Sequence, residues 1–182
     1  MSIFLLIGLF IFIFLVFIFT IVFIIFLIFA FPIFLGAPFV PVCSEEINKI
    51  LKLANPKPRE ILYDLGSGDG RIIIEAAKKY DVRAIGIEIN PFLFYFSRWK
   101  IKKLGLQERV KVLWSNFFKK DISQANIIII YLLQRTNYRL ERKFLSDLRP
   151  GTRIISKSFI FKNLPLVKSD SEYPHIRLYQ IP

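Results

Sequence analysis

The segment from residue 63 to residue 71 holds three glycines and two aspartates, and it is the part of this sequence best suited to bind a ligand. Gly66, Gly68 and Gly70 allow a sharp turn and let a ligand approach the main chain with no Cβ atom in the way. Their G-x-G-x-G spacing differs from the G-x-G-x-x-G of dinucleotide sites, and the chain has no phosphate-binding G-x-x-x-x-G-K-[ST] motif. A glycine cluster also serves tight packing in many strand-to-helix turns, so the acidic residues nearby decide between the two interpretations.

Three carboxylates accompany the glycines: Asp64, Asp69 and Glu88, the last of which follows Gly66 by 22 residues. In doubly wound sheets, an acidic residue at this spacing accepts hydrogen bonds from ribose hydroxyls. Taken alone, Glu88 would also fit a solvated strand end. In a chain whose formal net charge is +12, the three together favour a positively charged cofactor without phosphate. S-adenosyl-L-methionine, a sulfonium attached to adenosine, meets these conditions, and we predict it as the cofactor.

Short apolar runs alternate with longer segments, which is typical of βαβ units. We expect a doubly wound, Rossmann-like α/β sheet that is mostly parallel. Its final strand should be antiparallel, because the stretch before that strand is irregular and offers no crossover helix. The predicted strands are residues 61–65, 83–88, 110–114, 126–132, 152–158 and 176–181.

Three helices of this domain have recognisable ends. Ser44 is expected to cap a helix that runs to Ala54, with two glutamates in its first turn. Asn90 followed by Pro91 predicts a helix start, and Gly105 follows its end; Phe92, Phe96 and Trp99 share one face of this helix. A third helix is predicted at residues 137–148.

The first 44 residues contain no charged residue and no histidine, and they predict a transmembrane anchor before the domain. As a helix, Ile3 to Phe31 would span about 43 Å, more than the roughly 30 Å of hydrocarbon in a bilayer, and Pro32 is expected to end it. A cleaved signal peptide would need basic residues and a shorter apolar run, and a buried pair of strands would need a turn. We therefore divide the chain into an anchor, 1–37, and a domain, 38–182.

The first basic residues after the anchor are Lys49 and Lys52, so the positive-inside rule favours a single-pass protein with the domain in the cytoplasm. The anchor has no flanking Trp or Tyr, since the first of each type are Trp99 and Tyr63.

Cysteine and histidine give no sign of a metal site or an internal disulfide. Cys43 is the only cysteine and His175 the only histidine, which agrees with a reducing compartment. Because Cys43 follows the anchor closely, it is either an inert small residue, the interpretation we prefer, or a palmitoylation site.

The sequence resembles class I, seven-β-strand S-adenosylmethionine-dependent methyltransferases. Within that class it is similar to the membrane-anchored protein-lysine methyltransferases that include the ATP-synthase c-subunit and adenine-nucleotide-translocase enzymes, and to their prokaryotic relatives. The resemblance runs from about Pro38 to Ile181. It rests on the following segments: Phe-Val-Pro at 39–41, Ile-Leu-Tyr-Asp-Leu-Gly-Ser-Gly-Asp-Gly-Arg at 61–71, Gly-Ile-Glu at 86–88 and Ile-Tyr-Leu-Leu at 130–133.

The resemblance implies a set of cofactor-binding residues: Pro41, Asp64, Gly66, Ser67, Gly68, Asp69, Gly70, Glu88, Asn116 and Phe117. Asn116 stands where the family commonly has an aspartate facing the adenine amino group, and its side-chain oxygen can still accept from that group. Phe117 either stacks on adenine or packs in the core. The apolar residues from Phe39 to Val42 are expected to roof the cofactor site.

We expect Tyr131 and Leu133, together with Leu132, Phe39 and Pro41, to form the channel for the acceptor amine. Tyr131 would equally fit the core. The function predicted is protein-lysine N-methylation at a membrane. Two alternatives stay open: an RNA or small-molecule methyltransferase, and a non-catalytic, membrane-tethered nucleoside-binding module. The scattered basic residues favour anionic lipid over nucleic acid as their partner.

Overall fold

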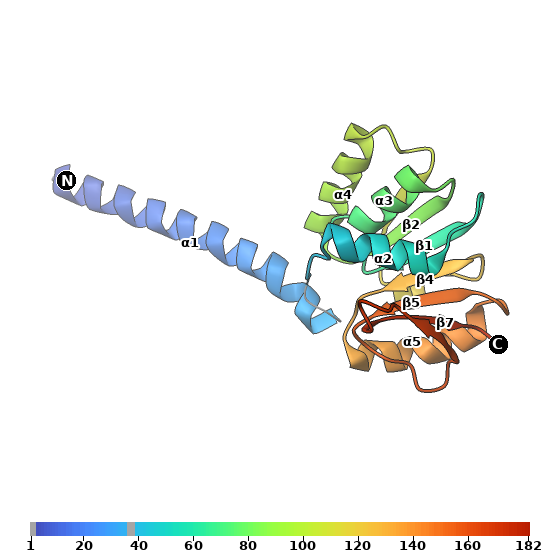
Figure 1. The fold of residues 1–182 in the computed structure, drawn as a ribbon. Coiled ribbons are helices and arrows are strands. Elements are labelled where there is room, and N and C mark those ends of the chain that lie inside the picture. The colour runs from blue at the N-terminus through green and yellow to red at the C-terminus, as the bar shows by residue number, and fades with distance from the viewer. Residues whose placement is uncertain (1–2, 36–38) are drawn as a thin grey trace.

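A seven-stranded sheet forms the centre of the computed structural model, which describes residues 3–35 and 39–182 (Figure 1). The strand order is β3-β2-β1-β4-β5-β7-β6. The strands are β1 (Ile61–Leu65), β2 (Arg83–Glu88), β3 (Val110–Trp114), β4 (Ile127–Ile130), β5 (Arg153–Lys157), β6 (Leu166–Ser169) and β7 (Ile176–Gln180).

The first five strands are parallel, and β7 runs antiparallel to β5, so the predicted fold class is confirmed. Every residue of β4 is an isoleucine and is buried, as expected for a parallel strand covered on both faces. The sequence did not predict β6. Its side chains are exposed or only partly buried at the edge of the sheet, and they lack the apolar alternation that marks a half-buried strand.

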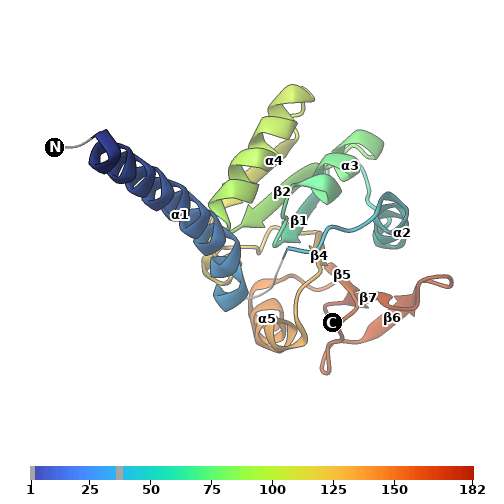
Figure 2. The same ribbon diagram turned by 90° about the vertical axis from the view of Figure 1, so that its left-hand side faces the viewer.

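Helices cover both faces of this sheet (Figure 2). Buried residues of α2 (Ser44–Ala54), α3 (Arg71–Lys79) and α4 (Pro91–Lys103) share one apolar cluster, whereas those of α5 (Gln134–Asp147) belong to the opposite one. This is the layered arrangement predicted from the alternation of strands and helices.

The helix ends agree with the sequence in part. Asn90 caps α4 by accepting from the main-chain N–H groups of Phe92, at 2.9 Å, and Leu93, at 3.4 Å. The prediction of Ser44 as a cap was wrong, because Cys43 holds the extended capping position and Ser44 is already helical. Helix α5 begins at Gln134, three residues before the predicted start.

The apolar N-terminal segment forms one helix, α1 (Ile3–Leu35), which projects from the domain in Figure 1. It continues past Pro32, so that proline does not end it as predicted; a proline removes one main-chain hydrogen bond, and a helix can continue beyond it. All side chains from Ile3 to Leu27 are exposed. By length and composition, this stretch is sufficient to cross a bilayer.

Candidate active site

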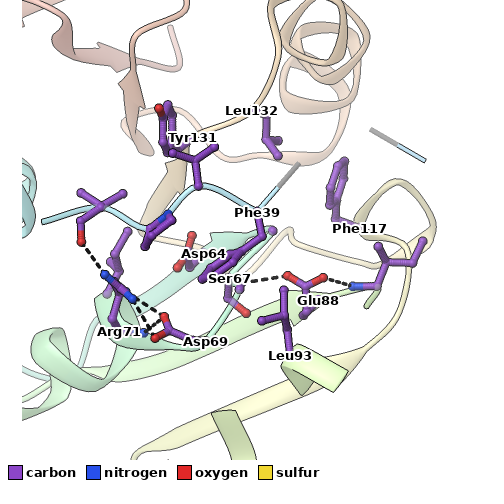
Figure 3. A pocket seen from close by; sticks show the side chains of 17 residues that line it. Phe39, Asp64, Ser67, Asp69, Arg71, Glu88, Leu93, Phe117, Tyr131 and Leu132 are labelled. Atoms are coloured by element: carbon purple, nitrogen blue, oxygen red, sulfur yellow. Dashed lines mark hydrogen bonds and ion pairs between the residues drawn. The ribbon is translucent and has the colours of Figure 1, made fainter. Parts of the chain in front are cut away.

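A cavity lies beside the carboxyl ends of β1, β2 and β4, where ligands bind in open α/β sheets (Figure 3). Its walls come from the glycine loop after β1, the end of β2, the first turn of α4, the loop after β4 and the segment 39–42. The predicted site residues that line it are Pro41, Asp64, Gly66, Ser67, Gly68, Asp69, Glu88, Phe117 and Tyr131. Three predicted residues, Gly70, Asn116 and Leu133, lie outside this lining.

Gly68 shows why this loop needs glycine. Its φ of +55° lies in the left-handed region, which residues with a Cβ atom rarely adopt. A Cβ atom on Gly68 would also lie 2.5 Å from Cε2 of Phe39. The ring of Phe39 therefore packs directly on the glycine loop, and Figure 3 shows it between that loop and Leu132.

Asp64 is a buried acidic group with no basic side chain paired to it among the described residues. It is only 3% exposed, and among the described residues its Oδ2 atom has no hydrogen-bond partner. Burial, followed by the charges of Glu88 and Asp69, raises its pKa from 3.8 to about 8. The buried hydroxyl of Ser67 also has no partner in the described part of the chain. Both oxygens can therefore accept hydrogen bonds from a ligand, and Asp64 gains from one that is cationic.

Glu88 is fixed in place by the main chain. Its Oε2 accepts from the N–H of Gly68 at 2.8 Å, and its Oε1 accepts from Ile89 and Asn90 at 2.8 and 2.7 Å. Burial raises the pKa of this carboxyl, and these hydrogen bonds oppose the rise. Each carboxylate oxygen can accept two hydrogen bonds, so Oε2 keeps capacity for a ribose hydroxyl.

Asp69 differs from the other two carboxylates because its charge is compensated. Arg71 approaches its Oδ1 at 2.9 Å, and the ammonium of Lys100 lies 3.0 Å from its Oδ2. Burial raises the pKa of Asp69, but these bonds outweigh burial, and the net effect lowers it. The guanidinium also donates to the carbonyl of Val42 at 2.8 Å, so it fastens the segment 39–42 to the glycine loop.

Sequence reasoning missed both basic partners of Asp69. Arg71 ends the glycine motif and could have been found there. Lys100 lies on the next helix, and nothing in the sequence links it to the loop.

The two predicted residues after β3 are positioned by a short 3₁₀ helix, Phe117–Lys119. Asn116 caps this helix, since its side chain accepts from the N–H of Phe118 at 2.9 Å. Phe117 is buried in the core cluster and also lines the cavity, so it packs in the core, and stacking on adenine stays a prediction.

Tyr131 and Leu132 line the cavity at the end of β4, whereas Leu133 is exposed and precedes α5. The ammonium of Lys157 lies 4.0 Å from the centre of the Tyr131 ring, and it is held there by Glu46 at 3.2 Å. No sequence motif indicated the ion pair of Lys157 with Glu46, because β5 and α2 meet only in the folded chain.

No group of three or more His, Cys, Asp or Glu side chains in the described residues is arranged to hold a metal ion. Nε2 of His175 lies 3.0 Å from a carboxylate oxygen of Glu46. Cys43 is free and exposed.

The residues around the cavity fit S-adenosylmethionine. In the part of the chain that the structure describes, they supply two buried carboxylates without a paired cation, Asp64 and Glu88, and the main chain orients the second of them as a ribose hydroxyl would require. They also supply a buried hydroxyl with no partner among the described residues. A cofactor with a phosphate would instead meet the charges of Asp64 and Glu88.

Comparison with known proteins points the same way. The protein-lysine N-methyltransferase of Saccharolobus islandicus is 40% identical over 123 residues, which cover 67% of this chain and 76% of that protein. The human lysine N-methyltransferase of the ATP-synthase c-subunit is 36% identical over 124 residues, 68% of this chain but 52% of its own length. The chain thus spans about three quarters of the Saccharolobus islandicus protein and about half of the human one.

A solved structure of an RNA methyltransferase from Salinibacter ruber, in complex with S-adenosyl-L-homocysteine, superposes with a TM-score of 0.72 at 34% identity. It covers 78% of this chain and 92% of that one. The ligand bound there is what S-adenosylmethionine becomes after methyl transfer, so the predicted cofactor is the one that this related structure uses. The family model for the ANTKMT methyltransferase domain matches residues 64–168. The chain therefore belongs to the ANTKMT methyltransferase family, which confirms the resemblance and the enzyme class predicted from its sequence.

Proposed function

We propose that this chain methylates a lysine side chain of a protein held at a membrane, with S-adenosylmethionine as methyl donor. The observation that carries the proposal is the cavity itself. Two buried carboxylates, Asp64 and Glu88, lie beneath an apolar segment, 39–42, that follows the apolar helix α1 after a few residues. A cationic cofactor and a membrane-proximal acceptor suit this arrangement.

Each wall of the cavity has a part in holding the cofactor. Glu88 accepts from the ribose, while Asp64 and Ser67 offer oxygens to its amino-acid portion. Phe117 offers an aromatic surface to the adenine. When bound, S-adenosylmethionine supplies a methyl group on a positively charged sulfur. An amine can displace that sulfur from the methyl group directly. The protein has mainly to align the amine with that methyl group and to exclude water.

The acceptor lysine must lose its proton first. With an ordinary pKa near 10.4, only about one lysine in a few thousand is neutral at pH 7. An apolar channel disfavours the charged form and lowers that pKa. Tyr131, Leu132 and Phe39 provide such walls where they line the cavity, and Leu133 stands exposed at the start of α5.

The function is tested with the full chain reconstituted in vesicles, labelled S-adenosylmethionine and host membranes. Label recovered as methyl-lysine in a membrane protein supports the proposal. Label in RNA would overturn it in favour of the activity for which the Salinibacter ruber protein is named, and cofactor binding without any transfer would indicate a binding module. Glu88→Gln should abolish transfer, whereas Glu108→Gln, a change at an exposed residue outside the cavity, should not.

The acceptor channel is tested by Tyr131→Ala and Leu133→Ala, which should lower methyl transfer more than they weaken cofactor binding. Tyr138→Ala is the matched control, since Tyr138 is exposed on α5. Full methylation by both channel variants would remove their assignment.

The membrane arrangement is part of the same proposal, with residues 1–37 as a single-pass anchor and residues 38–182 as a cytoplasmic domain. The exposure of Ile3 to Leu27 supports it, as do Lys49 and Lys52, which follow the anchor. Flotation with vesicles tests the anchor, and protease protection in intact cells tests its orientation. A chain that stays in solution after flotation would contradict this part.

A further inference from the structure

Helix α4 carries an exposed aromatic face. Phe92, Tyr95, Phe96 and Trp99 follow the i, i+3, i+4, i+7 spacing that places residues on one side of a helix. Their side chains are 40–61% exposed. The opposite side of the helix, with Leu93, Phe94, Ser97 and Ile101, is buried against the domain. The helix thus has two apolar faces, and the sheet covers only one.

The aromatic face continues into basic residues. Lys102 and Lys103 extend the stripe by one turn, and Lys103 places its ammonium 5.2 Å from the centre of the Trp99 ring. No acidic residue occurs in α4. On the neighbouring edge strand β3, Trp114 is exposed as well, and its ring centre lies 6.1 Å from that of Phe94 in α4. Aromatic rings beside lysines are typical of protein surfaces that lie in the headgroup region of a bilayer.

The connection to α1 places this face near the anchor. Leu35 ends α1 and Phe39 already lines the cavity, so their Cα atoms are joined by four steps of about 3.8 Å each and lie at most about 15 Å apart. Leu93, in the first turn of α4, lines the same cavity. Figure 1 shows α4 on the side of the domain from which α1 projects.

We propose that the aromatic face of α4, with Lys102 and Lys103, rests in the headgroup region of an anionic bilayer beside α1. This inference rests on the proposed function only in taking α1 as a membrane anchor. The segment around α1 lacks the Trp and Tyr residues that usually mark a membrane interface, and in the folded protein α4 supplies them. Two attachments, α1 and α4, would restrict rotation about the anchor and keep the mouth of the cavity close to the bilayer.

Charge favours lipid over a second copy of the chain. In a symmetric dimer formed through this face, the lysines at the end of α4 would add like charges to one interface with no acidic partner on the helix. An anionic lipid surface attracts the same lysines.

The test uses Trp114→Phe, which leaves Trp99 as the single tryptophan. The full chain is reconstituted in vesicles with and without phosphatidylserine, and lipids brominated near the headgroup serve as quenchers. An interfacial helix lies roughly 5–10 Å deep, so we expect loss of about half of the Trp99 fluorescence, and less without phosphatidylserine. As matched control, Tyr138→Trp on α5, in a chain with Trp99→Phe and Trp114→Phe, should keep its fluorescence.

Flotation of the same vesicles separates the possible failures. If the chain floats but Trp99 is not quenched, the contact of α4 is overturned while the proposed function stands. Cross-linked dimers with unquenched Trp99 would assign the face to a second copy instead. A chain that does not float overturns the anchor and the contact together. Quenching in a protein that transfers no methyl group would support the contact and contradict the function.

Discussion

Replacing Asp64 with Asn is expected to remove a large pH dependence of the protein's stability. Asp64 is almost fully buried, and burial with two neighbouring carboxylates raises its pKa from 3.8 to about 8. Between these two values, the folded protein holds a proton on Asp64 that the unfolded chain has released. By proton linkage, the free energy of unfolding of the cofactor-free protein must fall as pH rises through this window.

The size of the effect follows from the one proton involved. A difference of one bound proton changes the free energy of unfolding by roughly 1–2 kcal/mol per pH unit. From pH 6 to pH 8, Asp64 alone should therefore lower the stability by about 2 kcal/mol. An asparagine has nearly the same shape and cannot ionise, so Asp64→Asn should show none of this loss and should be the more stable protein at pH 8.

The assay is urea denaturation of the full chain in detergent micelles at pH 6, 7 and 8, followed by tryptophan fluorescence. Asp81→Asn, a change at an exposed aspartate outside the cavity, is the control and should follow the unmodified protein. If the Asp64→Asn and unmodified proteins lose stability in parallel as pH rises, Asp64 does not carry the proton, and the reasoning from burial is refuted.

Three further predictions come from the same site. Because a cationic cofactor favours ionised Asp64, S-adenosylmethionine should bind about fivefold more tightly at pH 8 than at pH 7, and Asp64→Asn should abolish that difference in calorimetry. Gly68→Ala should lower the free energy of unfolding by more than the roughly 1–2 kcal/mol that a left-handed alanine costs, because its Cβ atom would also meet the ring of Phe39. Gly105 has a positive φ as well but open space around it, so Gly105→Ala gives the backbone strain alone when both variants are compared by urea denaturation. Lys157→Met should destabilise the protein by about 1–3 kcal/mol, since Glu46 loses its ammonium partner but keeps Nε2 of His175. In a double-mutant cycle with Glu46→Gln, a coupling energy near zero would contradict that last prediction.

The parts of the fold that the sequence predicted are those set by neighbours in the chain. The glycine loop needs positive φ at Gly68, and Asn90 caps a helix through its own next residues; both signals are local. Strand β6 escaped prediction because it is a four-residue exposed edge strand without apolar alternation, and its pairing with β7 arises only in the folded sheet. The early start of α5 at Gln134 likewise has no sequence signal, as no side chain caps it.

In the candidate site too, the sequence indicated the residues that neighbours in the chain or the strand order bring together, and it missed those that only the folded chain brings in. Asp64 and Glu88 end adjacent parallel strands, so their proximity follows from the topology. Lys100 and Lys157 reach the site from elements far away in the sequence, and nothing in composition distinguishes them from the other basic residues. The phenylalanine spacing in α4 predicted a shared face, but only the packed structure reveals that this face is exposed.

A net charge of +12 repels a cationic cofactor at long range, but the repulsion is weak inside the cavity because of the distances over which charges act. Charges on the surface are screened within about 8–10 Å at ordinary ionic strength, whereas buried charges are screened much less. Of the three carboxylates at the cavity, Asp69 is compensated by Arg71 and Lys100, while Asp64 and Glu88 have no cation bound to them among the described residues. The positive charge of the cofactor would therefore face two buried carboxyl groups and favour their ionised forms, and the basic exterior acts on whatever faces the outside of the protein. Local burial, rather than net charge, decides which ion this cavity accepts.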